Sequence, residues 1–419
     1  MLDVVVRRAR LKNGDVVDIG IEGERIAALG AVVEGEARLE LDAAEQLVLP
    51  GFANIHLHLD KVLTAMQLPP WPDGTFQESI DLTLDLRRQY THEDLLRRGR
   101  LVLDRCIRYG TSAVRAVADV GTVGGLLPAQ VLCELRDEYR GRIEVQVCAF
   151  PQEGLIRDPG ADELLVQAME EVGCDVVGSF PWFELCHEHA QQHVDFTFEL
   201  ARRLDRDLHA FVDDEPIAPH TRNLEQLALA TLKHGWEGRV SASHACGIAS
   251  YDDFGAERLI RLVAQAGITI SSNAHVSLVS KCQHAPEPVP RGITRVRELI
   301  AHGVNVTCAQ DDVADPYYPF GRGDMLEVAS FLAHTAHLYR PGDVEYVLDA
   351  ITVGAAKGMR LDDYGLEVGK RADLVVFEEG DTATELLRLQ PARRWVLHGG
   401  RVVAETRTET TLAGAAAAR

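Results

Sequence analysis

The sequence predicts an α/β protein, in which a (β/α)8 TIM barrel is joined to a small β-sandwich domain built from both termini. From residue 52 to residue 350, short apolar runs alternate with segments of helical periodicity. The rhythm is about eight strand–helix units over roughly 300 residues, which is typical of such a barrel. Short strand-like runs broken by glycine-containing turns occupy both ends of the chain.

The first fifty residues are expected to form short strands, at 4–6, 16–21 and 25–29. Strand-like runs return at 372–377 and 395–403, so the two termini are expected to share one β domain. We therefore divide the chain into residues 1–50 and 356–405 for the two parts of the small β domain, 51–355 for the barrel, and 406–419 for a flexible tail.

The barrel strands are expected to be short, apolar and separated by amphipathic helices such as the one around 258–263. A first strand leads into residues 54–60. The later candidates lie at 113–117, 143–147, 176–178, 207–211, 240–243, 268–271 and 304–307.

The composition excludes some classes of partner. A net charge of -21 argues against binding to nucleic acid or to an anionic membrane, because both would repel the chain. The eight cysteines include no pair with CxxC spacing, and no apolar run reaches the roughly 18 residues that span a bilayer. With no signal peptide, the chain is expected to be cytoplasmic with reduced thiols.

The most informative stretch is Asn54-Ile55-His56-Leu57-His58-Leu59-Asp60, directly after Leu49-Pro50-Gly51-Phe52. Residues i and i+2 of a strand point to the same face, so both imidazoles converge. Two neutral imidazoles are good ligands for a divalent metal such as zinc or iron. An isolated His-x-His pair is more often two ordinary histidines at a strand end. The preceding Pro50-Gly51-Phe52 and the acidic residues downstream favour a metal site instead.

Further polar residues stand where the predicted strands end, which is where such barrels carry their catalytic groups. They are Asp119, Gln152, His209, Asp213, Asp214, His244, Asp311 and Asp312. Histidines and a terminal aspartate spread over separate strands are suited to binding one metal ion and activating its water.

This pattern resembles the amidohydrolase superfamily, and within it the cytosine deaminase-like branch, over nearly the whole chain. The stretches that carry the resemblance are 149–154, 290–296, 311–321 and 324–326. The run His58-Leu59-Asp60-Lys61 is also similar to N-isopropylammelide hydrolase, an s-triazine member of the same branch.

The resemblance implies a set of roles. One divalent metal, zinc or iron with manganese as an option, would be bound by His56, His58, His209 and Asp311. Asp311 would also take a proton from the metal-bound water, which His244 would orient. The heterocyclic substrate would be contacted by Gln152, Asp312, Tyr317 and Lys61.

The fifth strand departs from the branch, which has His-x-Asp-Glu there. Matching the histidine gives His209-Ala210-Phe211-Val212, which keeps the ligand and loses both acids. Matching the acids gives Phe211-Val212-Asp213-Asp214, which puts phenylalanine in the ligand's place. We prefer the first alignment, in which Val212 replaces the proton-donating glutamate and Asp213 or Asp214 could substitute for it, or form a solvated loop pair.

Other departures make the expected pocket less polar. Val117, Trp182 and Gln310 stand where relatives carry histidines, so the pocket should not bind cytosine well. Candidate walls, equally explained as plain core, are Phe76, Trp71, Trp182 and Tyr317. Lys61 could donate a proton, hold an anionic group, or pair with Asp60.

The expected activity is hydrolysis of a C–N bond in a small nitrogen heterocycle, most simply a deamination that releases ammonia, with Asp311, His244 and Asp214 as catalytic residues. Two alternatives stay open. The chain could hydrolyse an N-alkylamino triazine or a cyclic amide, or it could bind a heterocycle without turning it over. By analogy with relatives, a homo-oligomer is also an option.

Overall fold

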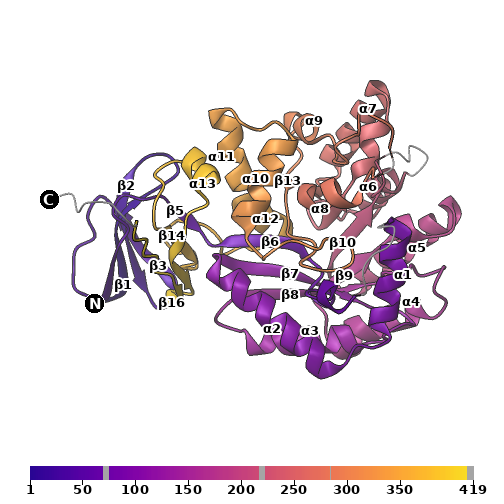
Figure 1. Cartoon of the computed structure of the whole chain (residues 1–419), viewed down its shortest axis with the longest axis horizontal. Coiled ribbons are helices and arrows are strands. Elements are labelled where there is room, and N and C mark those ends of the chain that lie inside the picture. Colours follow the sequence, from indigo (N-terminus) through magenta and orange to yellow (C-terminus); the bar gives the residue numbers. More distant parts are fainter. Residues whose placement is uncertain (69–74, 217–221, 284, 413–419) are drawn as a thin grey trace.

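In the computed structural model, residues 1–68, 75–216, 222–283 and 285–412 are described. The fold is an eight-stranded parallel barrel with a second, all-β part beside it (Figure 1). This confirms the predicted fold class.

The barrel strands follow one another in chain order around the sheet, and each is parallel to its neighbours. They are β6 (Phe52–Leu57), β7 (Thr111–Asp119), β8 (Glu144–Phe150), β9 (Val176–Ser179), β10 (Asp207–Val212), β11 (Val240–His244), β12 (Thr269–Ser271) and β13 (Val306–Thr307).

The barrel closes next to the paired histidines. The His58 amide donates to the Asp311 carbonyl at 2.8 Å, and the Asp311 amide donates to the His56 carbonyl at 2.8 Å. A parallel bridge between Leu57 and Asp311 completes this seam. The backbone that shuts the barrel therefore also fixes where these side chains begin.

Helices cover the outside of the barrel (Figure 1). They are α1 (Phe76–Arg87), α2 (His92–Arg108), α3 (Leu127–Glu138), α4 (Ala161–Gln167), α5 (His187–Arg203), α6 (Asn223–His234), α7 (Asp253–Gln265), α8 (Ala274–Ser280), α9 (Val296–Ala301), α10 (Met325–Thr335), α11 (Pro341–Asp349), α12 (Val353–Met359) and, near the β part, α13 (Ala383–Leu389).

Local sequence explains where these helices start. Thr91 caps α2 by accepting a hydrogen bond from the Asp94 amide, and acidic residues fill the first turn. Apolar residues such as Leu95, Val102 and Cys106 recur at helical spacing and face the strands.

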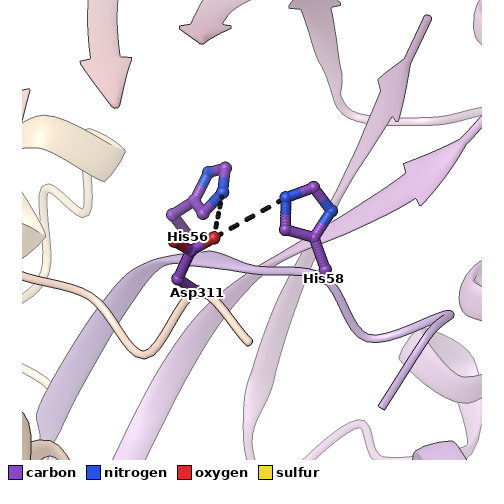
Figure 2. A group of neighbouring side chains, drawn as sticks. All are labelled: His56, His58 and Asp311. Atoms are coloured by element: carbon purple, nitrogen blue, oxygen red, sulfur yellow. Dashed lines mark ion pairs between the residues drawn. The ribbon is translucent and has the colours of Figure 1, made fainter. Parts of the chain in front are cut away.

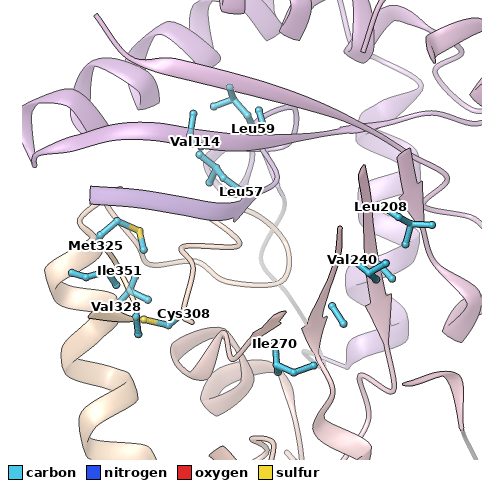
Figure 3. Packing of buried hydrophobic residues seen from close by; sticks show 14 of the residues in the cluster. Leu57, Leu59, Val114, Leu208, Val240, Ile270, Cys308, Met325, Val328 and Ile351 are labelled. Carbon is cyan, nitrogen blue, oxygen red and sulfur yellow. The ribbon is translucent and has the colours of Figure 1, made fainter. Parts of the chain in front are cut away.

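The main core lies between the strands and the helices (Figure 3). Strand residues Leu57, Leu208 and Val240 pack in the same buried cluster as Met325 and Val328 of α10. Because side chains alternate along a strand, residues of the other parity are directed into the barrel.

The β part contains two four-stranded sheets. One has the order β3-β2-β1-β4 and comes from the N-terminus alone, while the other has the order β16-β15-β14-β5 and combines both ends of the chain. Their bounds are β1 (Leu2–Arg10), β2 (Val16–Glu22), β3 (Arg25–Gly30), β4 (Ala37–Asp42), β5 (Val48–Pro50), β14 (Leu374–Phe377), β15 (Arg393–His398) and β16 (Arg401–Glu405).

The two sheets share one apolar core, to which Val6 and Ile19 contribute from the first sheet and Val376 and Leu397 from the second. Such shared burial is what a β-sandwich requires. Among the described residues, the helices include none that is long and apolar enough to cross a membrane.

Candidate active site

The carboxyl ends of three barrel strands carry unusual backbone. Asp213 has a φ of 45°, His244 a φ of 68° and Asp311 a φ of 60°, all in the left-handed region that non-glycine residues seldom adopt. Such strain costs about 1–3 kcal/mol each and concentrates at functional sites. These three positions therefore mark the end of the barrel where the chemistry is expected.

His56, His58 and Asp311 form a compact group of possible metal ligands (Figure 2). Asp311 Oδ1 lies 3.0 Å from His56 Nε2 and 3.6 Å from His58 Nε2. Burial, with smaller contributions from Lys61 and His56, holds the pKa of His58 well below its usual range, so this ring is neutral. Neutral imidazoles and a carboxylate are the donors that zinc and iron take.

These donors form no well-aligned hydrogen bond within the described residues, although they pair as ions with one another and with His244. His56 Nε2 and both carboxylate oxygens of Asp311 are buried, and within the described residues none has a contact with the geometry of a hydrogen bond. Leaving buried polar atoms unsatisfied is costly unless something binds them. The group therefore fits a cation.

His209 belongs to the same cluster. Its Nε2 lies 2.6 Å from His56 Nδ1, and its Nδ1 lies 2.8 Å from the Ser241 hydroxyl. Burial and the neighbouring His56 keep the pKa of His209 well below its usual range. The 2.6 Å separation is that of a hydrogen bond, and it uses His56 Nδ1, whereas His56 Nε2 faces Asp311.

The neighbours of His209 bear on the two alignments considered for the fifth strand. Val212 packs in the main core, whereas Phe211 faces the site, with its ring centroid 4.0 Å from that of His244. Keeping His209 toward the metal group is thus compatible with the strand's alternation, and it leaves no acid at Val212.

The two aspartates that follow the strand have different positions. Asp213 accepts hydrogen bonds from the amides of Asn223 and Leu224, at 2.9 and 3.0 Å, where α6 begins. Asp214 instead lines the pocket, with Oδ1 at 3.1 Å from His244 Nδ1. Asp214 is therefore the one of the two acids that borders the pocket.

His244 connects Asp214 to the metal group, because its Nε2 lies 3.2 Å from Asp311 Oδ2. Burial disfavours the imidazolium, but the carboxylates of Asp214 and Asp311 outweigh it and raise the pKa of His244 to about 10. Burial likewise works against ionised Asp311, but His244 and His56 hold the pKa of Asp311 well below its usual range. Asp311 is thus a carboxylate, as metal binding requires.

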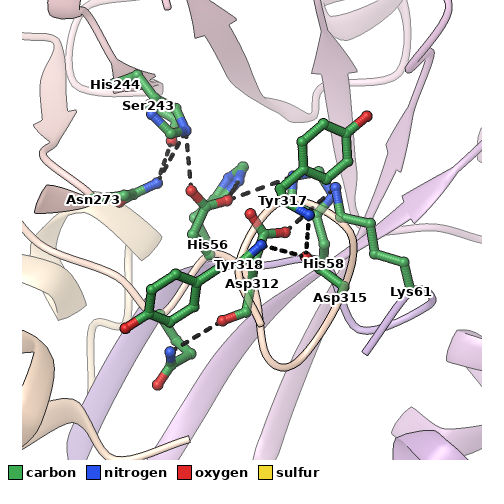
Figure 4. Close-up of polar contacts among 12 residues, drawn as sticks. His56, His58, Lys61, Ser243, His244, Asn273, Asp312, Asp315, Tyr317 and Tyr318 are labelled. Carbon is green, nitrogen blue, oxygen red and sulfur yellow. Dashed lines mark hydrogen bonds and ion pairs between the residues drawn. The ribbon is translucent and has the colours of Figure 1, made fainter. Parts of the chain in front are cut away.

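Lys61 sits in a second polar cluster (Figure 4). Its ammonium lies 3.4 Å from Asp312 Oδ1 and 4.4 Å from the centre of the Tyr317 ring. The pairing with Asp60 considered from the sequence is not the one recorded: Asp60 Oδ2 accepts from the Asp119 amide at 3.0 Å. Lys61 is therefore a pocket residue.

These groups line one pocket. Gln152 lines it, and its buried Oε1 has no hydrogen-bond partner in the described chain. Trp182 and Tyr317, two of the candidate walls, line it as well. Trp71 and the side chain of Phe76, the other candidate walls, lie outside the described residues.

The three positions where relatives carry histidines lie in different environments. Val117 packs in an apolar cluster with Phe180 and Phe211, against which Trp182 also lies. Gln310 does not line the pocket; its amide holds the backbone of Asp312 at 3.1 Å and of Gly323 at 3.1 Å. One wall of the pocket is therefore apolar and aromatic.

Sequence reasoning passed over some residues that line or brace the site. Lys281 lines the pocket and forms an ion pair with Asp214. Arg87 is buried between Asp119 and Glu153, with Glu153 Oε1 at 3.1 Å. Lys281 is a lone charged residue after an apolar run, and Arg87 is one of an adjacent arginine pair; both patterns are common in the chain.

Comparison with known proteins gives the family. The model of the amidohydrolase family matches residues 77–404. The chain belongs to the amidohydrolase family. It is therefore a hydrolase of C–N bonds other than peptide bonds, as predicted, and the family is metal-dependent.

Individual relatives cover almost the whole chain. N-isopropylammelide isopropyl amidohydrolase of Pseudomonas sp. (strain ADP) is 29% identical over 407 residues, which are 96% of this chain and 97% of that protein. Pterin deaminase of Rhizobium rhizogenes is 30% identical over 88% of this chain and 84% of its own length. The structure of 5-methylcytosine deaminase from Klebsiella pneumoniae, liganded with phosphonocytosine, superposes with a TM-score of 0.92 at 30% identity, over 97% of this chain and 100% of that one.

Proposed function

We propose that this amidohydrolase removes an exocyclic amino group from a small aromatic nitrogen heterocycle and releases ammonia. The observation that carries the proposal is the group of orphaned donors of His56, His58 and Asp311 at the edge of an aromatic-lined pocket. The aromatic side chains of Phe180, Trp182 and Phe211 that line this pocket suit a flat heterocyclic ring. The relatives at about 30% identity include enzymes named for pterin and for 5-methylcytosine.

His56, His58, His209 and Asp311 would hold one zinc or iron ion. When bound, such an ion lowers the pKa of a coordinated water so that hydroxide is available at neutral pH. The side chains do the remaining work. The neutral rings of His58 and His209 leave lone pairs for the ion, and the barrel seam at Asp311 fixes the carboxylate beside them.

Asp311 and His244 would manage the protons. Asp311 is an ionised carboxylate, so it can accept a proton from water and pass it to the leaving amine. His244, 3.2 Å from Asp311, is cationic beside two carboxylates and can donate a hydrogen bond to the attacking oxygen. Asp214 would hold His244 in the orientation that this donation needs.

Substrate contacts would come from the polar side and from the apolar, aromatic side of the pocket. Gln152 offers a buried amide oxygen for a ring N–H, and Asp312 with Lys61 offers a donor–acceptor pair. The ring would stack against the aromatic side chains, of which Trp182 and Phe211 belong to the apolar wall. The replacement of a histidine by Trp182 favours a ring more apolar than cytosine.

A second candidate is hydrolysis of an N-alkylamino triazine, with release of an alkylamine. The observation that favours it is Lys61, which follows the histidine pair in the stretch similar to N-isopropylammelide hydrolase and faces the pocket. The apolar wall would accommodate an alkyl group. The product distinguishes the two reactions, because deamination gives ammonia and the alternative gives an alkylamine.

The test has two steps. Metal content per chain is measured by elemental mass spectrometry for the wild type, for the double variant His56→Ala/His58→Ala, and for His92→Ala, which removes an exposed histidine paired with Glu134. We expect about one zinc or iron per chain in the wild type and His92→Ala, and none in the double variant.

The metal-loaded protein is then screened for ammonia and alkylamine release over aminated pyrimidines, pterins and triazines. Asp311→Ala should abolish turnover and keep the fold, judged by circular dichroism. A wild type that binds no metal after growth in metal-supplemented medium, or an active Asp311→Ala variant, would refute the assignment.

A further inference from the structure

Lys281 is a buried cation at the pocket that the roles above do not use. Its side chain is 3% exposed, it lines the pocket, and its ammonium pairs with Asp214 Oδ2. Burying an ammonium costs free energy even when it is paired, so a purely structural role at a pocket wall would lower the stability of the fold. Because Lys281 borders the pocket in which a ligand would bind, a role in contacting that ligand is favoured.

Lys281 belongs to a chain of charged groups that includes the metal donor Asp311. Asp214 Oδ1 meets His244 Nδ1 at 3.1 Å, and His244 Nε2 meets Asp311 Oδ2 at 3.2 Å. The order is cation, anion, cation, anion, and all four side chains line the same pocket. Asp214 therefore fixes Lys281 relative to His244, which itself is fixed relative to Asp311.

The stretch 290–296, which carried part of the family resemblance but no role, supports Lys281. Gly292 has a φ of 71°, and a Cβ at this position would lie 3.0 Å from Lys281 Cβ and 3.1 Å from the Ser277 carbonyl. That carbonyl already accepts the Lys281 amide at 3.0 Å, at the end of α8. The loop therefore closes against the lysine stem at a point where only glycine fits.

The fifth strand explains why a cation is needed here. Val212, where the branch carries its glutamate, packs away from the pocket in the main core. As the oxygen of water bonds to the ring carbon, the electron pair of the C=N bond moves onto the ring nitrogen. Without an acid from the fifth strand, some other group must meet that charge.

Resting on the proposed function, we propose that Lys281 contacts the heterocycle and compensates the negative charge that the ring gains when water adds. An ammonium carries three N–H donors, so it can contact Asp214 and a ligand together. No proton needs to leave the lysine, because a charge-assisted hydrogen bond stabilises the anionic ring. Asp214 and Gly292 are then positioning residues for Lys281.

The test uses ligand binding as well as turnover. Barbiturate, whose ring is anionic at neutral pH, and uracil, whose ring is neutral, are titrated into the metal-loaded protein and followed by calorimetry. Lys281→Met keeps the length of the stem and removes the charge, Lys281→Arg keeps the charge, and Lys370→Met removes a lysine of the β part that contacts the Asp362 carbonyl.

We expect Lys281→Met to weaken barbiturate binding about 10- to 100-fold and to leave uracil binding unchanged, since a hydrogen bond to a charged group is lost. Its kcat should fall by at least the same factor with little change in KM, while metal content stays at the wild-type level. Lys281→Arg should recover part of both losses, and Lys370→Met should behave as wild type.

Other outcomes overturn the inference. Equal loss of both ligands, or loss of metal, in Lys281→Met would make Lys281 a structural residue, and unchanged barbiturate binding and kcat would remove it from the site. If Lys281→Met does not fold, Lys281→Arg and Gly292→Ala decide: wild-type barbiturate binding in Gly292→Ala would contradict the positioning argument. A wild type that binds neither probe and releases no amine would instead refute the proposed function.

Discussion

Asp213 and Asp214 were equal candidates from the sequence, and the structure predicts opposite behaviour for them. Asp213 accepts from two buried amides at the start of α6, those of Asn223 and Leu224, at 2.9 and 3.0 Å. Asp214 faces His244 and the pocket. Asp213→Ala should therefore lower stability and spare catalysis, whereas Asp214→Asn should abolish catalysis.

The cost of the first change follows from the two hydrogen bonds. Each bond to a charged group contributes about 1.5–3 kcal/mol, so losing both predicts a loss of about 3–6 kcal/mol in the free energy of unfolding. Asparagine keeps one acceptor oxygen and tolerates the φ of 45° at this position. Asp213→Asn should therefore lose only about half as much.

The assay combines urea unfolding, followed by circular dichroism, with steady-state kinetics on the substrate found by the amine screen. Folded Asp213→Asn should keep kcat within about threefold, a barrier change below about 0.7 kcal/mol. Asp214→Asn should lose at least about 100-fold, the lower range for a misplaced proton-transfer group. A stable Asp213→Ala variant with little activity would refute the reasoning.

Three further predictions concern the metal and the scaffold. Chelation should lower the thermal midpoint in calorimetry, because a ligand present at about 100 times its Kd stabilises by about 2.7 kcal/mol, and His56→Ala should abolish this difference. Gly178→Ala should cost about 1–3 kcal/mol in urea unfolding, since its Cβ would lie 2.3 Å from a backbone oxygen, while Gly342→Ala, in open space, should be nearly neutral. Burial opposes the charge of Glu184, but His193 and backbone amides hold the pKa of Glu184 below its usual range. The stabilisation from ionised Glu184 is therefore present above pH 4.5 and is lost as the pH falls further. The urea midpoints of the wild type and Glu184→Gln should therefore converge on going from pH 7 to pH 3.

The barrel could be predicted because its signal is repeated. Each strand is an apolar run followed by a helix of different periodicity, and eight repeats average out local errors. The paired histidines could be predicted because the two-residue period of a strand places both on one face. The β-sandwich followed from strand-like runs at both ends, which have nothing else to pair with.

The direction of single side chains beyond a strand end could not be predicted. Asp213 and Asp214 are adjacent and chemically alike, and only the φ of 45° at Asp213, together with the start of α6, separates them. Lys281 lies at the end of a short helix, where no periodicity indicates that it reaches back to Asp214. These contacts depend on how the segments that follow β10, β11, β12 and β13 are arranged in the folded chain.

If Lys281 takes the place of the branch's glutamate, as proposed, the chemistry that the pocket favours changes as well. A protonated glutamate would transfer its proton and leave the ring neutral, whereas the proposed role of Lys281 is to donate a hydrogen bond from its ion pair with Asp214. A second pair, Lys61 with Asp312, lines the same pocket. Each pair has no net charge, so any stabilisation of an anionic ring would come from hydrogen bonds that the ammonium groups donate to it. The proposed role of Lys281 therefore predicts faster turnover of electron-poor or oxo-substituted heterocycles, in which added charge is delocalised, than of cytosine.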